Sequence, residues 1–266
     1  MDLGVRGKSL LIVGGTAGMG YATAQVLADE GANLTVVGRD MDKTERKAAA
    51  LRERGANVLA LLADGGRRGE IERVVEQAAA HYGALHGLAV TAGPTGGRKS
   101  GPLDFDEADW ERAFQVILMM GVRACNAAVP HLRKAGGGAI VLTAAYSIRG
   151  LAPYLMPYVA MKSAVASLAK NLAISLGPDN IRVNCVCPGA IATEALDPAK
   201  AEAVRLYGGS EEEALGRMMR EQWKMDVALG RAGRPNELGE LYAFLLSDKA
   251  GYLTGAIINE DGGTKF

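Results

Sequence analysis

The sequence predicts an α/β protein built on one doubly wound parallel sheet of about seven strands with helices on both faces. Short apolar runs alternate with amphipathic stretches of about 12 to 20 residues, as in consecutive βαβ units. The runs are almost wholly apolar, because helices cover both faces of parallel strands. No repeat or interdomain linker interrupts the pattern, so we expect residues 1–266 to form a single domain.

The elements follow one another regularly. Strands are predicted at residues 9–14, 33–38, 57–62, 87–91, 139–143, 181–187 and 256–259. Helices are predicted at residues 18–30, 42–53, 68–81, 106–133, 157–176 and 235–247. A polar, methionine-containing insertion at residues 197–226 is also predicted to be helical.

Composition excludes several functions. The 30 basic residues balance the 30 acidic ones, so nothing attracts nucleic acid or an anionic membrane. No apolar stretch approaches the roughly 20 residues that span a bilayer, and residues 10–13 are too short for a signal peptide. The three cysteines, two of them Cys185 and Cys187 on one strand, indicate a reducing cytoplasm rather than disulfides or a metal site. The expected partners are small molecules.

A glycine-rich turn follows the first strand. Gly14, Gly18 and Gly20, with Thr16 and Met19 between them, lead directly into a helix. A backbone without side chains can turn tightly and approach a pyrophosphate, whose charge then faces the free amides at the positive end of the helix. The alternative is that these glycines serve only helix–sheet packing. The strand before and the helix after favour a Rossmann-type dinucleotide site.

The end of the second strand distinguishes between cofactors. An acid there binds the ribose hydroxyls of NAD, whereas an arginine accommodates the 2′-phosphate of NADP. Gly38 occupies the place of the acid and Arg39 follows it, which favours NADP(H). NAD(H) stays possible, because Arg39 could be a solvated surface residue and Asp40 could bind the ribose or cap the next helix.

Further motifs extend over the whole chain, and with them the chain resembles the short-chain dehydrogenase/reductase family, in its ketoreductase and hydroxysteroid-dehydrogenase branch. The matching segments are residues 13–20 (TGxxxGxG, with Val13 for threonine), 90–93 (NNAG, with both asparagines replaced), 158–162 (YxxxK), 182–189 (RVNxxxPG), 231–235 and 261–263. The resemblance implies a homotetramer and a substrate lid at about residues 191–228.

The resemblance also assigns individual residues. Asp64 would bind the adenine amino group, and Ile191 and Thr193 would contact the nicotinamide amide. The full set of implied cofactor-binding residues is Gly14, Thr16, Gly18, Met19, Gly20, Arg39, Asp64, Gly65, Ala92, Gly93, Tyr158, Lys162, Pro188, Gly189, Ile191 and Thr193.

Tyr158 and Lys162 are the candidate catalytic residues. Four positions apart in a helical pattern, they project from one face. A phenol with a pKa of about 10 exchanges protons poorly at neutral pH, and a nearby ammonium is expected to lower that pKa. Tyr158 would then be the acid/base, and the resemblance implies that Lys162 also binds the nicotinamide ribose.

Two catalytic positions of the family are altered. Ala145 stands where a substrate-binding serine is usual, and Ile117 stands where an asparagine helps to hold a water molecule that relays protons to the lysine. Loss of one donor to a developing oxyanion typically slows a reaction by about 10²–10³. Ser147 or the hydroxyl of Tyr146 could substitute if the loop turns inward.

These changes leave three functions open. The first is an NAD(P)H-dependent interconversion of a ketone and a secondary alcohol. The second is reduction of an activated C=C bond, although Leu155 lies seven residues before the lysine, where enoyl reductases of the family have tyrosine. The third is an NADP(H)-binding protein with impaired catalysis, against which the intact tyrosine–lysine pair argues.

Apolar residues near the site suggest a hydrophobic substrate. They precede the tyrosine and recur in the insertion, and methionine side chains repack easily around a ligand. They are Leu151, Tyr154, Leu155, Met156, Tyr207, Met218, Met219, Trp223 and Met225. The alternative is that they pack helices or contact another subunit.

Overall fold

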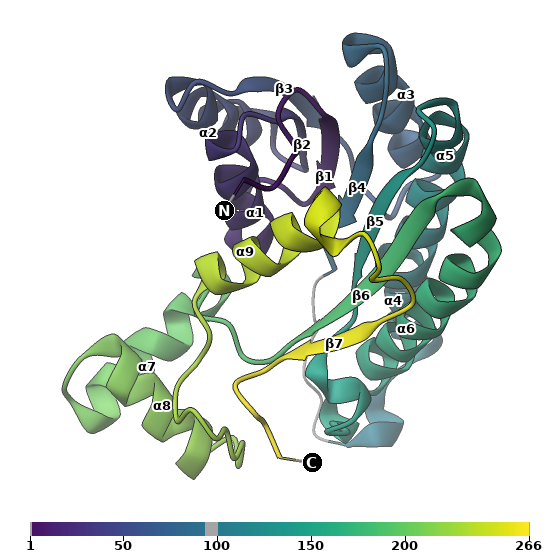
Figure 1. The fold of residues 1–266 in the computed structure, drawn as a ribbon. Coiled ribbons are helices and arrows are strands. Elements are labelled where there is room, and N and C mark those ends of the chain that lie inside the picture. Colours follow the sequence, from purple (N-terminus) through teal and green to yellow (C-terminus); the bar gives the residue numbers. More distant parts are fainter. Residues whose placement is uncertain (1, 94–100, 266) are drawn as a thin grey trace.

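The computed structural model describes residues 2–93 and 101–265, and it contains a seven-stranded, entirely parallel sheet (Figure 1). The strand order is β3-β2-β1-β4-β5-β6-β7. The strands are β1 Ser9–Val13, β2 Asn33–Gly38, β3 Asn57–Leu62, β4 Gly87–Val90, β5 Gly138–Thr143, β6 Ile181–Pro188 and β7 Ile257–Glu260. The predicted doubly wound fold is confirmed, and its order reverses between β1 and β4, where such sheets bind ligands.

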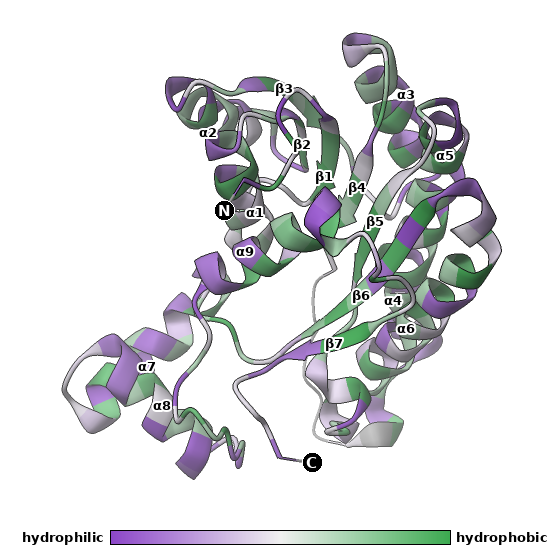
Figure 2. Ribbon diagram, viewed as in Figure 1, coloured by the Kyte–Doolittle hydropathy of each residue, from purple (hydrophilic) through white to green (hydrophobic). Residues whose placement is uncertain are grey.

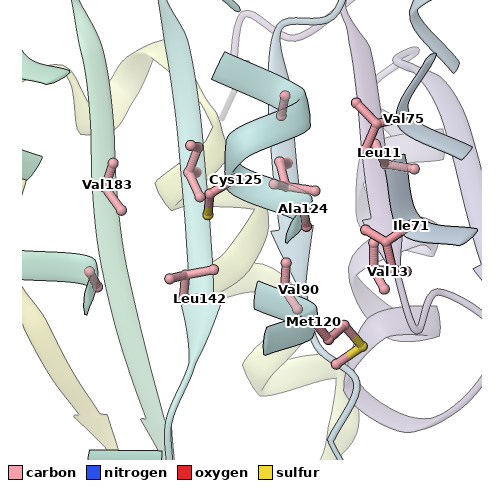
Figure 3. Packing of buried hydrophobic residues seen from close by; sticks show 14 of the residues in the cluster. Leu11, Val13, Ile71, Val75, Val90, Met120, Ala124, Cys125, Leu142 and Val183 are labelled. Atoms are coloured by element: carbon pink, nitrogen blue, oxygen red, sulfur yellow. The ribbon is translucent and has the colours of Figure 1, made fainter. Parts of the chain in front are cut away.

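Alternate strand residues feed two cores, one on each face of the sheet. Leu10 and Ile12 of β1 join one core, together with α1 (Gly18–Asp29), α2 (Met41–Glu53) and α9 (Pro235–Leu246). Leu11 and Val13 point to the opposite core, which α3 (Glu70–Tyr82), α5 (Met120–Lys134) and α6 (Met156–Leu176) cover (Figure 3). This double coverage explains why the strands are apolar throughout.

The helix predicted at residues 106–133 is not regular. It begins as α4 (Glu107–Ala113), widens into a π-helix over Phe114–Met119, and continues as α5. Contrary to the sequence-based expectation, Glu107–Lys134 is long and apolar enough by composition to span a membrane, because an 18-residue window within it has a mean hydropathy of 1.3. Half of the residues in that 18-residue window are buried inside the protein. The helix α5, which contains part of it, packs on the sheet. Its apolar character is therefore that of a core helix.

The insertion forms two helices, α7 (Asp197–Tyr207) and α8 (Glu211–Glu221), which project from the body of the sheet (Figure 1). Gly208 and Gly209 separate them with positive φ angles of 66° and 79°, and Ser210 caps α8. One small apolar core lies between the two helices and a second between α8 and the segment after β6, and hydrophilic and hydrophobic residues are mixed along both helices in Figure 2.

Candidate active site

The glycine-rich turn requires glycine for steric reasons. Gly14 has a φ of 91°, and a Cβ there would lie 2.8 Å from the backbone nitrogen of Ala92. A Cβ on Gly20 would lie 2.3 Å from the carbonyl oxygen of Gly14. The packing role of these glycines and a phosphate-binding role are thus compatible, because close packing presses α1 against the turn.

The end of β2 is closed to a side chain at position 38. A Cβ on Gly38 would lie 2.4 Å from the hydroxyl of Thr44 and 2.9 Å from that of Thr16. Asp40 caps α2 by accepting a hydrogen bond from the Lys43 amide at 3.0 Å. Arg39 is exposed and makes no hydrogen bond or ion pair with residues 2–93 or 101–265, so a cation with no partner stands at this edge.

Asp64 follows β3 at the same edge. Its carboxylate accepts a hydrogen bond from the amide of Gly66 at 3.0 Å and lies 3.5 Å from Arg67. Gly65 is buried beneath Met120, whose sulfur would lie 2.2 Å from a Cβ at position 65. The carboxylate therefore lies on the loop at this edge of the sheet, and its contact with the adenine stays a prediction.

Lys162 is the most distinctive group of the site. Its side chain is buried, with 2% of the residue exposed, and its Nζ donates a hydrogen bond of 2.7 Å to the carbonyl oxygen of Thr143 at the end of β5. Burial lowers the pKa of Lys162 to about 8. No carboxylate pairs with this ammonium in the described parts of the chain, although an unpaired buried charge is costly.

Gly93, after β4, is the backbone neighbour of this lysine. Its φ is 142°, in the region that favours glycine. A Cβ at this position would lie 3.1 Å from the Lys162 Nζ and 4.0 Å from the Ile117 side chain. Ala92 precedes it, and its amide bonds the carbonyl of Val13. The substitution of Ile117 for asparagine therefore lies beside the lysine, as predicted, and makes that wall apolar.

Tyr158 differs from expectation in its acidity. The Lys162 Nζ lies 5.6 Å from the centre of the Tyr158 ring, but it bonds Thr143 rather than the phenol. Burial, with smaller contributions from Tyr146 and Cys187, raises the pKa of Tyr158 above its usual value. The expectation that the lysine lowers this pKa is wrong for the cofactor-free protein, because desolvation outweighs the distant ammonium.

The loop after β5 carries the substituted serine position. Ala145 is buried and offers no side-chain donor. Ser147 is also buried, and its hydroxyl has no partner in the described chain. Tyr146 is partly exposed, lies close enough to affect Tyr158, and directs its hydroxyl to the sulfur of Met225 at 3.5 Å.

The segment after β6 meets the glycine-rich turn. Pro188 ends the strand, and a Cβ on Gly189 would lie 2.7 Å from the Asp261 Cα. Thr193 packs on the turn, since its Cγ2 would lie 2.8 Å from a Cβ on Gly18. Ile191 packs its side chain in the core against Gly233, and its contact with the nicotinamide amide stays a prediction.

The prediction for the apolar pocket needs correction at the insertion. Met218 and Met219 are each 2% exposed: Met218 lies in a small core between α7 and α8, and Met219 lies in a second core between α8, Ala232 and the segment after β6. Tyr207 packs in the first of these cores, beneath Arg217. Met225 faces Tyr146 across the site. Amphipathic periodicity marks a residue as inward-facing without saying which of two interiors it enters.

Other residues at the site escaped the sequence analysis. The hydroxyl of Thr143 bonds the Val90 carbonyl at 2.6 Å and the Tyr242 hydroxyl at 2.6 Å, which fixes the carbonyl that holds Lys162. Glu194 accepts a hydrogen bond from the Gly18 amide at 3.0 Å. Local sequence gives no signal for either contact, because each joins residues far apart in the chain.

The fold and this edge define a class: a Rossmann-type oxidoreductase with a tyrosine and a buried lysine at the carboxyl ends of its strands. Residues 14–265 match the family profile described as enoyl-(acyl carrier protein) reductase. Dehydrogenase/reductase SDR family member 4 of Sus scrofa is 30% identical over 259 residues, which cover 97% of this chain and 87% of that protein. The chain belongs to the short-chain dehydrogenase/reductase family.

Solved structures agree with this assignment. L-sorbose reductase from Gluconobacter frateurii, complexed with NADPH and L-sorbose, has a TM-score of 0.90 and 30% identity, covering 99% of this chain and 98% of its own. A 7α-hydroxysteroid dehydrogenase complexed with NADH and 7-oxo glycochenodeoxycholic acid has a TM-score of 0.84 and 25% identity, covering 99% and 96%.

Proposed function

We propose that the protein is an NADPH-dependent reductase that converts a ketone into a secondary alcohol, with Tyr158 as the proton donor and Lys162 as its charged partner. The observation that carries this proposal is the buried Lys162 ammonium, held 2.7 Å from the Thr143 carbonyl with no carboxylate partner among residues 2–93 and 101–265. The fold gains nothing from such a charge, whereas a reaction that builds negative charge on oxygen does.

The residues at the edge of the sheet fit a dinucleotide. The cradle at Gly14 and Gly20 leaves no room for a Cβ, and Ala17, before α1, has no side-chain group to cap the helix. Apart from the Gly18 amide, which bonds the Glu194 carboxylate, the amides at the positive end of α1 are therefore open to a pyrophosphate. When bound, NADPH would supply a hydride to the carbonyl carbon. Arg39, exposed and unpaired within the described chain, would hold the 2′-phosphate, which NADH lacks.

The acidity of Tyr158 suits the direction of reduction. Because burial raises its pKa, the phenol is protonated at neutral pH and can donate to the oxygen that gains charge. Lys162, whose pKa is about 8, remains mostly charged at pH 7 and stabilises the phenolate that the transfer leaves.

We further propose that the Tyr146 hydroxyl replaces the serine lost at Ala145 as the second donor to the substrate oxygen. Its partner Met225 offers a thioether sulfur, which is a weak acceptor, and a substrate carbonyl oxygen would be a stronger acceptor for this hydroxyl. Ser147 is enclosed. Leu155 and Tyr154 pack together with Tyr158, and Met225 faces Tyr146, so the side chains around the site favour a hydrophobic ketone.

A second candidate, reduction of an activated C=C bond, is favoured by the description of the matching family profile. Leu155 argues against it, because it is buried and brings no donor to the site. A binding protein without activity would have no use for the buried lysine.

The proposal is tested by following NADPH oxidation with the purified protein against a panel of bulky ketones and matched enones. We expect turnover with ketones. Turnover with enones alone would establish the second candidate, and cofactor binding without any turnover would establish the inactive one.

We also propose a cytoplasmic homo-oligomer. Near the β7 edge of the sheet, Tyr252 is fully exposed and Ile257 is 37% exposed, and Ile174 on α6 is 70% exposed. Apolar residues this exposed are typical of subunit contacts. Light scattering during gel filtration should give a mass of about four chains, as the family resemblance implies.

A further inference from the structure

The positive end of α1 already holds an anion. The first amides of a helix have no partner within it, and Ala17, at the N-cap of α1, has no polar side-chain atom with which to bond them. Instead, the carboxylate of Glu194 accepts a hydrogen bond of 3.0 Å from the backbone nitrogen of Gly18. A carboxylate is favoured at this position by the helix dipole.

Glu194 is also the point where the insertion meets the sheet. Thr193, just before it, packs its Cγ2 on Gly18, and Glu194 opens the short 3₁₀ turn Glu194–Leu196 that leads directly into α7. Within residues 2–93 and 101–265 the Glu194 carboxylate makes no close ion pair, and Lys200, which pairs with Asp197, interacts with it only at longer range. The contact with α1 therefore anchors the first turn of the insertion to the glycine-rich turn.

We propose that Glu194 is an internal substitute for the cofactor pyrophosphate: its carboxylate occupies the phosphate site in the free protein, and the cofactor must displace it. The inference rests on the proposed dinucleotide site. The Gly18 amide that Glu194 bonds lies at the helix end that a pyrophosphate needs, and two anions there repel each other. Glu194 is exposed, so it can move aside into solvent.

Displacement has two consequences. The cofactor loses part of its affinity to this competition, and by linkage its binding releases the start of the insertion from the turn. Because NADPH and NADH share the pyrophosphate, Glu194 weakens both equally. The effect of Glu194 on affinity can therefore be told apart from that of Arg39, which is expected to change the affinity for NADPH alone, because only NADPH has the 2′-phosphate.

The test compares Glu194→Gln, which keeps the size of the side chain and removes its charge, with Glu202→Gln on α7. Glu202 pairs with Arg205 on its own helix and serves as the control. Affinity is measured by titrating nicotinamide fluorescence at low ionic strength. We expect Glu194→Gln to bind NADPH and NADH about tenfold more tightly than the wild type, and Glu202→Gln to bind both as the wild type does.

A second measurement does not depend on affinity. Hydrogen exchange of the cofactor-free wild type should show a protected Gly18 amide, which Glu194→Ala exposes and Glu202→Gln does not. NADPH should accelerate exchange at residues 194–200 of the wild type, and these residues should already exchange fast in Glu194→Ala.

The outcomes are distinct. Equal or weaker cofactor binding by Glu194→Gln, with the wild type binding normally, overturns this inference and leaves the proposed function intact. If neither protein binds NADPH or NADH, the proposed function is wrong, and this inference falls with it.

Discussion

The two halves of the sheet edge achieve their geometry by different means. In the cofactor half, after β1, β2 and β3, shape is set by what is missing: a Cβ at Gly14, Gly20 or Gly38 would lie within 3 Å of a neighbouring atom. In the catalytic half, after β4, β5 and β6, the decisive groups are side chains, above all Tyr158 and Lys162. The shape of the first half depends on positions that exclude a side chain, and the proposed chemistry of the second half depends on side chains that carry protons.

The difference explains where substitution is tolerated. In the cofactor half the motif glycines are present, because a Cβ would collide with backbone at Gly14 and Gly20 and with the Thr193 side chain at Gly18. In the catalytic half Ala145 and Ile117 replace polar residues and are simply buried, so the fold is undisturbed. Polar residues of the second half can therefore be replaced without a change in the fold, whereas the glycines of the first half cannot. The following predictions test this difference between the two halves.

The largest effect is expected for Tyr158→Phe. Removal of the proton donor should lower kcat by about 10³, within the range of general acid catalysis. Because the ring is retained, NADPH affinity should change less than about twofold. Steady-state kinetics and a fluorescence titration measure the two quantities. Retained turnover would remove Tyr158 from the acid/base role.

Tyr146→Phe should come next. If its hydroxyl replaces the lost serine, kcat/KM should fall by about 10². Adding Ala145→Ser to this variant should restore most of the loss, whereas Ala145→Ser alone should have little effect, because a donor is already present. If Tyr146→Phe is neutral while Ala145→Ser accelerates the reaction, the wild type works without this donor.

The cofactor half is probed by Arg39→Ala. One charge-assisted contact to a phosphate is lost, so the Kd for NADPH should rise by about 10- to 100-fold, while that for NADH stays within about twofold. Arg46→Ala, an exposed arginine on α2, is the matched control. Equal weakening of both cofactors by Arg39→Ala would contradict NADPH preference.

The smallest effect concerns the stability of the catalytic half. Burial, reinforced by Glu237 and Glu240, raises the pKa of Glu260 on β7 to about 7, and its Oε2 has no hydrogen-bond partner in the described chain. The pKa of this carboxyl is about 4.3 in the unfolded chain. Because folding raises it, the contribution of Glu260 to the free energy of unfolding is complete only below that pH, where the carboxyl is protonated in both states. That contribution is lost as the pH rises through 7.

The free energy of unfolding should therefore fall by about 1–2 kcal/mol between pH 5 and pH 8, allowing for solvent at a half-buried site. Urea titrations at both values measure it. Glu260→Gln should abolish this loss, and Glu240→Gln, an exposed acid on α9, should leave most of it. A Glu260→Gln protein with the full pH dependence would show that another group is responsible.

Sequence predicted most of this architecture because strand periodicity and turn residues are local. The predicted bounds of β2 and β3 are those of the structure. The π-helix at Phe114–Met119 was missed, since apolar spacing cannot distinguish one wide turn from a regular one. The break between α7 and α8 was predictable: Gly208 and Gly209 precede Ser210, which forms a capping box with Glu213.

The candidate site divides in the same way. The motifs predict that the site residues follow the carboxyl ends of parallel strands, and in the structure these residues lie along one edge of the sheet. The acidity of Tyr158 and the anchoring of Lys162 on Thr143 could not be predicted, because they depend on burial and on contacts between distant segments such as Thr143 and Tyr242. Sequence motifs therefore predict where a titratable group lies, whereas its protonation state depends on how the folded chain packs around it.

The closure at the end of β2 limits how cofactor preference could be redesigned. Installing an aspartate at Gly38 would be the obvious route to an NAD-selective enzyme, yet the new side chain would run into Thr44, which is completely buried. A successful redesign must first shorten that threonine and remake its bond to the Asp40 carbonyl. Exchange of Arg39 alone yields a less selective protein rather than one with reversed selectivity.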